Sequence, residues 1–121
     1  MTDYVILFPA DNEAEWNQGT EADHQAVYDT DNEFGRLLEQ RGGRIIGGAE
    51  LASTRRTRVV RRGPNGTALV TNGPYAESVE QLAGFYVVTT DDEAGLIEAT
   101  KVLIRSHPAV EIRPVEDSDS N

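Results

Sequence analysis

Asp31 is the residue of this 121-residue chain whose type and position point most clearly to chemistry. Val27, Phe34 and Leu38 recur at helical spacing around it, so Asp31 falls on the apolar stripe of an expected helix. A carboxylate on a core-facing stripe costs free energy unless it is hydrogen-bonded or reaches a cleft. We therefore predict that Asp31 is a catalytic acid/base group in a pocket, because perturbed carboxylates mark clefts. The alternative is a carboxylate at the rim of a dimer, paired with an arginine.

His24 lies seven residues before Asp31, two helical turns back on the same face. The separation of about 10 Å along the helix axis is too long for a direct hydrogen bond. A substrate or a water molecule could bridge the two side chains, so His24 is predicted as a second catalytic group.

The segment from Asn72 to Tyr75 offers candidate ligand contacts. The amide of Asn72 and the hydroxyl of Tyr75 would touch a ligand at the mouth of the pocket, with Pro74 shaping the loop between them. The alternative is that Asn72, Gly73 and Pro74 set a turn and that Tyr75 packs as a hydrophobic plug.

Charge is distributed unevenly along the chain. Eleven basic and 21 acidic residues give a net charge of −10, and nine acids precede the first arginine, Arg36. Five arginines then crowd positions 55 to 62, and no acid occurs between Leu51 and Ala76. This cluster could bind an anionic ligand or nucleic acid. We favour a solvated hairpin whose arginines pair with the acidic first helix or with a partner subunit. The acidic total argues against nucleic acid or an anionic membrane as the main partner.

Several kinds of site have no support in the sequence. The absence of cysteine excludes disulfide scaffolds and thiolate metal sites. Two histidines without closely spaced carboxylates give no metal motif, and there is no phosphate loop, nucleophile elbow or dinucleotide fingerprint. We therefore expect neither a metal nor a cofactor. His107, just before Pro108, is interpreted as structural, because a histidine at the end of a helix complements the helix dipole.

The location of the protein follows from its apolar runs. None approaches the roughly 20 residues of a membrane span. The first apolar run, residues 4–8, follows Asp3 without a basic region before it, so a signal peptide is not expected. The predicted location is the cytoplasm.

The elements that must position these residues follow a β-α-β-(β-β)-α-β order. Apolar patterning and turn residues predict strands at 4–9, 44–51, 57–62, 67–71, 84–89 and 110–115, and helices at 20–40 and 90–108. Thr20 with Asp23 is expected to cap the first helix and Thr90 with Glu93 the second, and residues 63–66 are expected to form the turn of a hairpin. This order predicts a ferredoxin-like α+β fold, an antiparallel sheet with two helices on one face. The other face then needs a partner, so we expect a face-to-face homodimer. Residues 116–121 are expected to form a polar, mobile tail.

The run from Thr71 to Tyr86 resembles the signature of DGPF-domain proteins, a branch of the YCII-related family. The spacing from Phe34 through Gly42 into residues 47–51, and the ending at 111–115, are also similar to that family. The resemblance implies one YCII/DGPF-type domain over residues 1–115 with a dimeric α/β-barrel type of ferredoxin-like fold. For some relatives a His–Asp acid/base pair in a cleft is proposed. In this chain the histidine position falls at Asp31 and the aspartate position near Gln40, so that pair does not carry over.

Two functions are compatible with these patterns. The first is a homodimer that binds or transforms a small polar or aromatic molecule in a pocket beside the first helix. The alternative is a non-catalytic regulatory or interaction module, linked to a sigma factor as the resemblance implies for some relatives.

Overall fold

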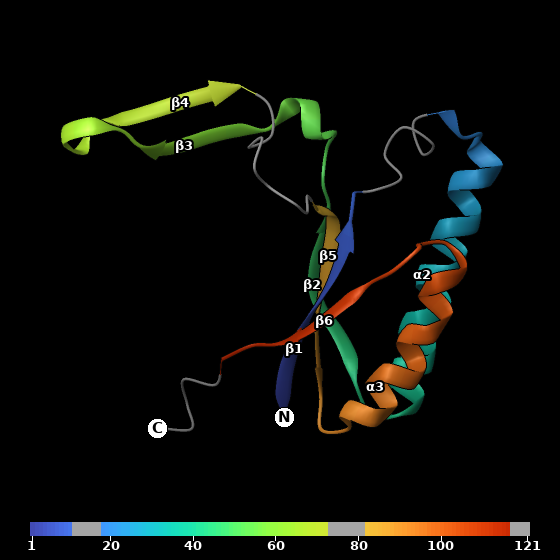
Figure 1. Cartoon of the computed structure of the whole chain (residues 1–121). Coiled ribbons are helices and arrows are strands. Elements are labelled where there is room, and N and C mark those ends of the chain that lie inside the picture. Colours follow the sequence, from blue (N-terminus) through green and yellow to red (C-terminus); the bar gives the residue numbers. More distant parts are fainter. Residues whose placement is uncertain (11–17, 73–81, 117–121) are drawn as a thin grey trace.

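Four strands form the main sheet of the structure, a computed structural model that describes residues 1–10, 18–72 and 82–116. Their order is β2-β5-β1-β6, and each neighbouring pair is antiparallel. Both helices lie on one face of this sheet (Figure 1). The elements are β1 (Thr2–Pro9), α2 (Glu21–Gln40), β2 (Arg44–Glu50), β5 (Leu82–Thr90), α3 (Glu93–Thr100) and β6 (Glu111–Pro114). This arrangement confirms the predicted α+β, ferredoxin-like fold.

Helix α2 carries Asp31 and begins where the sequence predicts. The Thr20 side chain accepts a hydrogen bond from the backbone N–H of Asp23 at 3.1 Å, and the Asp23 carboxylate accepts one from the backbone N–H of Thr20 at 2.9 Å. This capping box satisfies two N–H groups that the helix leaves unpaired. Phe34 and Leu38 are fully buried, so the stripe that contains Asp31 is turned toward the sheet.

Helix α3 differs from the prediction at both ends. Its N-cap is Asp92, whose carboxylate accepts a hydrogen bond from the N–H of Gly95 at 2.9 Å. The prediction that Thr90 caps this helix is wrong, because the Thr90 hydroxyl accepts from the N–H of Asp92 and shapes the turn before the helix. After Thr100 the chain tightens into a 3-10 helix over Lys101–Arg105, so the α-helix does not reach Pro108.

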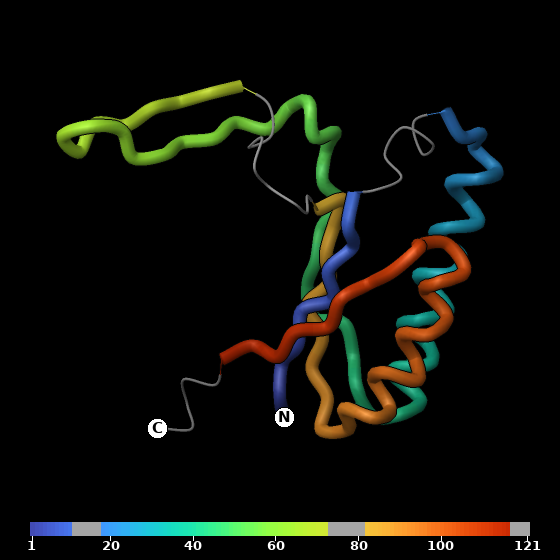
Figure 2. Tube along the Cα trace, in the orientation of Figure 1, coloured from blue at the N-terminus to red at the C-terminus, as the bar shows by residue number. Residues whose placement is uncertain are grey.

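The hydrophobic core lies between the helices and the sheet. Alternate residues of β1 point toward the helices, as the two-residue period of a strand requires. The path of the chain around this core is followed most easily in Figure 2. The buried apolar residues are Tyr4, Ile6, Phe8, Phe34, Leu38, Val88, Leu96, Ala99, Val102 and Leu103.

The face of the sheet turned away from the helices has no helix over it in the described residues (Figure 1). On this face Val5 opposes Val87 and Leu7 opposes Phe85 across β1 and β5. All four side chains are half-buried. We call these four residues the open face. It is the surface on which the expected homodimer would form, and the dimer itself stays a prediction.

A two-stranded arm, residues 58–72, forms a separate sheet. Strands β3 (Arg58–Arg62) and β4 (Ala68–Asn72) pair antiparallel with each other. The turn between them places Asn65 at φ +59° and Gly66 at φ +76°, left-handed conformations that these residue types tolerate. The predicted hairpin is confirmed. The arm extends away from the main sheet (Figures 1 and 2).

Some predictions fall on parts of the chain outside the described residues. These are Pro74 and Tyr75, and the expected tail beyond Glu116. No helix in the described ranges is long and apolar enough to cross a membrane.

Candidate functional site

Asp31 is held by the hydroxyl of Tyr86. The phenol donates a hydrogen bond of 2.9 Å to Oδ2 of Asp31, joining α2 to β5. The Tyr86 ring stacks on Phe34, with centroids 6.1 Å apart, and meets Phe8 edge-on at 5.4 Å. Burial, and then the adjacent Asp31 carboxylate, raise the pKa of Tyr86 well above its usual value. Tyr86 therefore stays protonated and remains a donor to Asp31.

His107 approaches the other oxygen of the same carboxylate. Its Nε2 lies 3.7 Å from Oδ1 of Asp31, within ion-pair range but too long for a hydrogen bond. Both atoms are buried and have no hydrogen-bond partner among the described residues. The side chains as a whole keep some exposure, 22% for His107 and 18% for Asp31. The two facing atoms thus lie within ion-pair range of each other, without a hydrogen bond between them.

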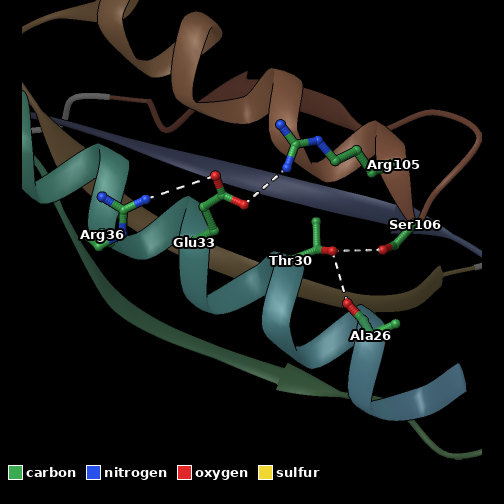
Figure 3. A network of polar contacts seen from close by, with 6 residues as sticks. All are labelled: Ala26, Thr30, Glu33, Arg36, Arg105 and Ser106. Carbon is green, nitrogen blue, oxygen red and sulfur yellow. Dashed lines mark hydrogen bonds and ion pairs between the residues drawn. The ribbon is translucent and has the colours of Figure 1, made fainter. Parts of the chain in front are cut away.

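Polar contacts of Arg105 and Ser106, the two residues before His107, tie this segment to α2 (Figure 3). The Ser106 hydroxyl donates to Oγ1 of Thr30 at 3.0 Å, and Thr30 donates in turn to the carbonyl of Ala26 at 2.9 Å. One residue earlier, the guanidinium of Arg105 pairs with Glu33 at 3.0 Å. Thr30 and Glu33 flank Asp31 on the helix, so these contacts fix where His107 lies.

A cavity of about 480 Å³ opens beside this pair. Tyr28 and Glu50 also line it, and the Tyr28 hydroxyl lies 3.4 Å from Oε2 of Glu50. None of the described lining residues is a lysine or an arginine, and the acidic and imidazole groups on the wall are those of Asp31, Glu50 and His107. The described walls are Val27, Tyr28, Asp31 and residues 8–10, 48–54, 82–86 and 106–108.

The predicted site residues have different places in the structure. Asp31 lies in the cavity wall, whereas His24, near the start of α2, is not among the lining residues. Asn72 ends β4 as an exposed residue and does not line the cavity. Pro74 and Tyr75 lie outside the described residues.

Two residues of the site, His107 and Tyr86, are not among those predicted from the sequence. His107 was interpreted as a helix-end residue because its distance from Asp31 along the chain hides their contact. Tyr86 lies in the signature run and in a predicted strand. Side chains of a strand alternate between its two faces, so Tyr86 lies on the same face as Val88, which is buried. This alternation is the sequence signal that could have placed Tyr86 toward α2. Within the described residues of one chain, the contacts of Asp31 are with Tyr86 and His107. The alternative, a carboxylate at a dimer rim paired with an arginine, stays a prediction.

No cluster of three or more histidine, aspartate or glutamate side chains suited to a metal ion occurs in the described ranges. The chemistry that the visible groups can perform is proton transfer. A histidine paired with a carboxylate is a common general base, because the carboxylate orients the ring and stabilises its charged form.

Comparison with known families agrees with the fold. The YCII-related domain matches residues 2–117 of the chain. The chain belongs to the YCII-related family. No curated protein gave a match. Assignment to the DGPF branch stays a prediction, since most of the segment that carries that motif lies outside the described residues. In this YCII-related chain the carboxylate comes from α2 and the imidazole from the segment after α3.

Proposed function

We propose that this YCII-related protein binds a small polar or aromatic molecule in the cavity beside α2 and transforms it by proton transfer. The observation that carries the proposal is the buried approach of His107 to Asp31 in the cavity wall. Aromatic and aliphatic walls with a few convergent polar groups are typical of small-molecule sites.

Each member of the site has a defined role in this proposal. In this proposal the 3.7 Å approach shortens when a molecule binds, and Asp31 accepts a hydrogen bond from Nε2–H of His107, which leaves the lone pair of Nδ1 available to the bound molecule. A proton leaves an O–H or C–H group of that molecule, binds Nδ1, and returns to the product. Asp31 stays ionised and stabilises the imidazolium. Tyr86 is a positioning residue, because it fixes the carboxylate from the other side.

The open face supports the homodimer as a second part of the proposal. A half-buried apolar surface of two central strands is stabilised when a second subunit covers it. The two helices lie on the opposite face (Figure 1). This dimer would therefore leave the α2 side of the cavity uncovered, while Phe85 belongs both to the open face and to the cavity lining. The alternative of a sigma-factor-linked module stays a prediction, and the paired acid and base favour the first function.

The experiment that tests the proposal combines binding and turnover. Phenol, a small neutral aromatic probe, should shift the amide NMR signals of residues 48–54 and 106–108 in the labelled protein. For any compound that the protein turns over, Asp31→Asn and His107→Gln should each lower kcat by roughly 10²–10⁴-fold. The matched control His24→Gln should stay close to wild type. Wild-type turnover in both site variants would contradict the proposal.

A further inference from the structure

The arm formed by β3 and β4 has an exposed apolar centre. Val60 opposes Val70 across the two strands, and both are about two-thirds exposed, at 67% and 64%. Arg58 and Arg62 lie on the same face, because each is two residues from Val60. An isolated two-stranded hairpin is only marginally stable in water. The arm therefore has the features of a surface that another molecule covers.

The distribution of charge along the chain indicates which molecule covers the arm. Residues 51–72 contain five arginines and no acid, a charge of +5, whereas the rest of the chain contains six basic and 21 acidic residues, a charge of −15. In the described part of the chain, the side chains of Arg55, Arg56 and Arg62 make no ion pair. A second copy of this chain supplies the complementary negative surface at equal concentration.

The position of the arm points to the same occupant. The helices lie on one side of the main sheet, and the arm extends toward the other side, where the open face lies (Figure 1). A second copy that covers Val5, Leu7, Phe85 and Val87 would therefore also lie within reach of the arm.

We propose that the arm of one protomer lies against the acidic surface of a second copy of this chain, with Val60 and Val70 at the centre of the contact. Arg58 and Arg62 pair with carboxylates of that copy. The inference rests on the homodimer of the proposed function and extends it to a named element. Nucleic acid is the weaker candidate, because the −15 of the remaining chain repels a polyanion. Residues 51–72 also contain no aromatic side chain on which a base could stack.

Cross-linking from the arm tests the contact directly, because the chain has no natural cysteine. The variant Val60→Cys carries a benzophenone label, and protein of natural isotope content is mixed with ¹⁵N-labelled protein. We expect cross-linked peptides that join one light and one heavy chain. The control Glu98→Cys, with an exposed label on α3, should give few such products. Cross-links only within one chain, or none, would overturn the proposal.

A charge reversal gives a second readout. The double variant Arg58→Glu/Arg62→Glu should weaken dimerisation at low salt by about tenfold or more, and phenol binding in the cavity should not change. An unchanged dimer would overturn the arm contact but leave the open-face dimer standing. A wild-type monomer at micromolar concentration would overturn both, while phenol binding would still report on the cavity. Binding of a DNA duplex that competes with dimerisation and is lost in the same variant would assign the arm to nucleic acid instead.

Discussion

His107 and Asp31 lie 76 residues apart in the sequence, yet Nε2 of the imidazole lies 3.7 Å from Oδ1 of the carboxylate. The second carboxylate oxygen is already occupied by the Tyr86 hydroxyl at 2.9 Å. Asp31 is therefore oriented from the sheet, and the oxygen that remains is turned to the histidine. A buried acid with one free oxygen beside an imidazole is an arrangement suited to proton transfer.

Loss of the Ser106 hydroxyl should loosen His107. Ser106→Ala removes the hydrogen bond to Thr30 that ties this segment to α2, and we expect a loss of about 1 kcal/mol in the free energy of unfolding. Urea denaturation measures this change. The control Lys101→Gln breaks an exposed ion pair with Glu98, which should cost about 0.5 kcal/mol or less. Equal effects of the two variants would contradict a special role for Ser106.

Tyr86 should make the stability depend on alkaline pH. Its pKa is raised in the folded protein, so the unfolded chain loses the phenolic proton first, near the ordinary value of 10.0. The contribution of Tyr86 to the free energy of unfolding is thus complete below that pH and falls as the pH rises above it. Tyr86→Phe should flatten this decline, measured by denaturation from neutral to alkaline pH. Tyr28→Phe is the control. Burial and then Glu50 raise the pKa of Tyr28 as well, but Tyr28 is 41% exposed and should change the slope less.

The cavity should prefer neutral ligands over anionic ones. Asp31 and Glu50 both line it without a described lysine or arginine to offset their charge. Two carboxylates near a bound anion repel it, so phenol should bind at least about tenfold more tightly than benzoate. The measurement is an NMR titration with each probe. Glu50→Gln should reduce the difference in affinity between phenol and benzoate. Tighter binding of benzoate than of phenol by the wild type would contradict this electrostatic explanation.

Gly48 should be the glycine of the cavity wall that tolerates a side chain least. Its φ is +146°, and a Cβ there would collide with the carbonyl oxygen of Phe85. We expect Gly48→Ala to destabilise the fold by roughly 2 kcal/mol or more, because strain and a backbone clash add. Gly66→Ala is the matched control, since Gly66 also has a positive φ but has open space around it, and it should cost about 1 kcal/mol. Thermal unfolding measures the stability that each variant loses. Equal losses of stability would contradict the predicted clash at Gly48.

The order and type of the elements could be predicted because each has a local signal. The capping box at Thr20 and Asp23 and the turn at Asn65 and Gly66 depend on residues close in sequence, and both formed as predicted. Asp31 was identified because a carboxylate interrupts an apolar stripe. The start of α3 was predicted wrongly because the side chains of Thr90 and Asp92 can both cap a helix. Strand β5 continues to the buried Thr90, so the helix begins only after Asp92.

The partners of Asp31 could not be predicted from local pattern. His24 was chosen because it lies on the same helix face, whereas the contact comes from His107, which the tertiary fold delivers. The contacts that place it, Ser106 to Thr30 and Arg105 to Glu33, join residues far apart in sequence. A single sequence carries no signal for such a pairing, because side-chain proximity across the core depends on how the helices pack.

The protonation pattern of His107 tests the central claim most directly. Long-range ¹H–¹⁵N correlation spectra of the protein with ¹⁵N-labelled histidine report which ring nitrogen carries the proton, and His24 serves as an internal reference. The account predicts that neutral His107 carries its proton on Nε2, facing Asp31, with Nδ1 unprotonated, and that Asp31→Leu changes this signal but not that of His24. A proton on Nδ1 of His107, or a spectrum that Asp31→Leu leaves unchanged, would contradict the acid/base pair.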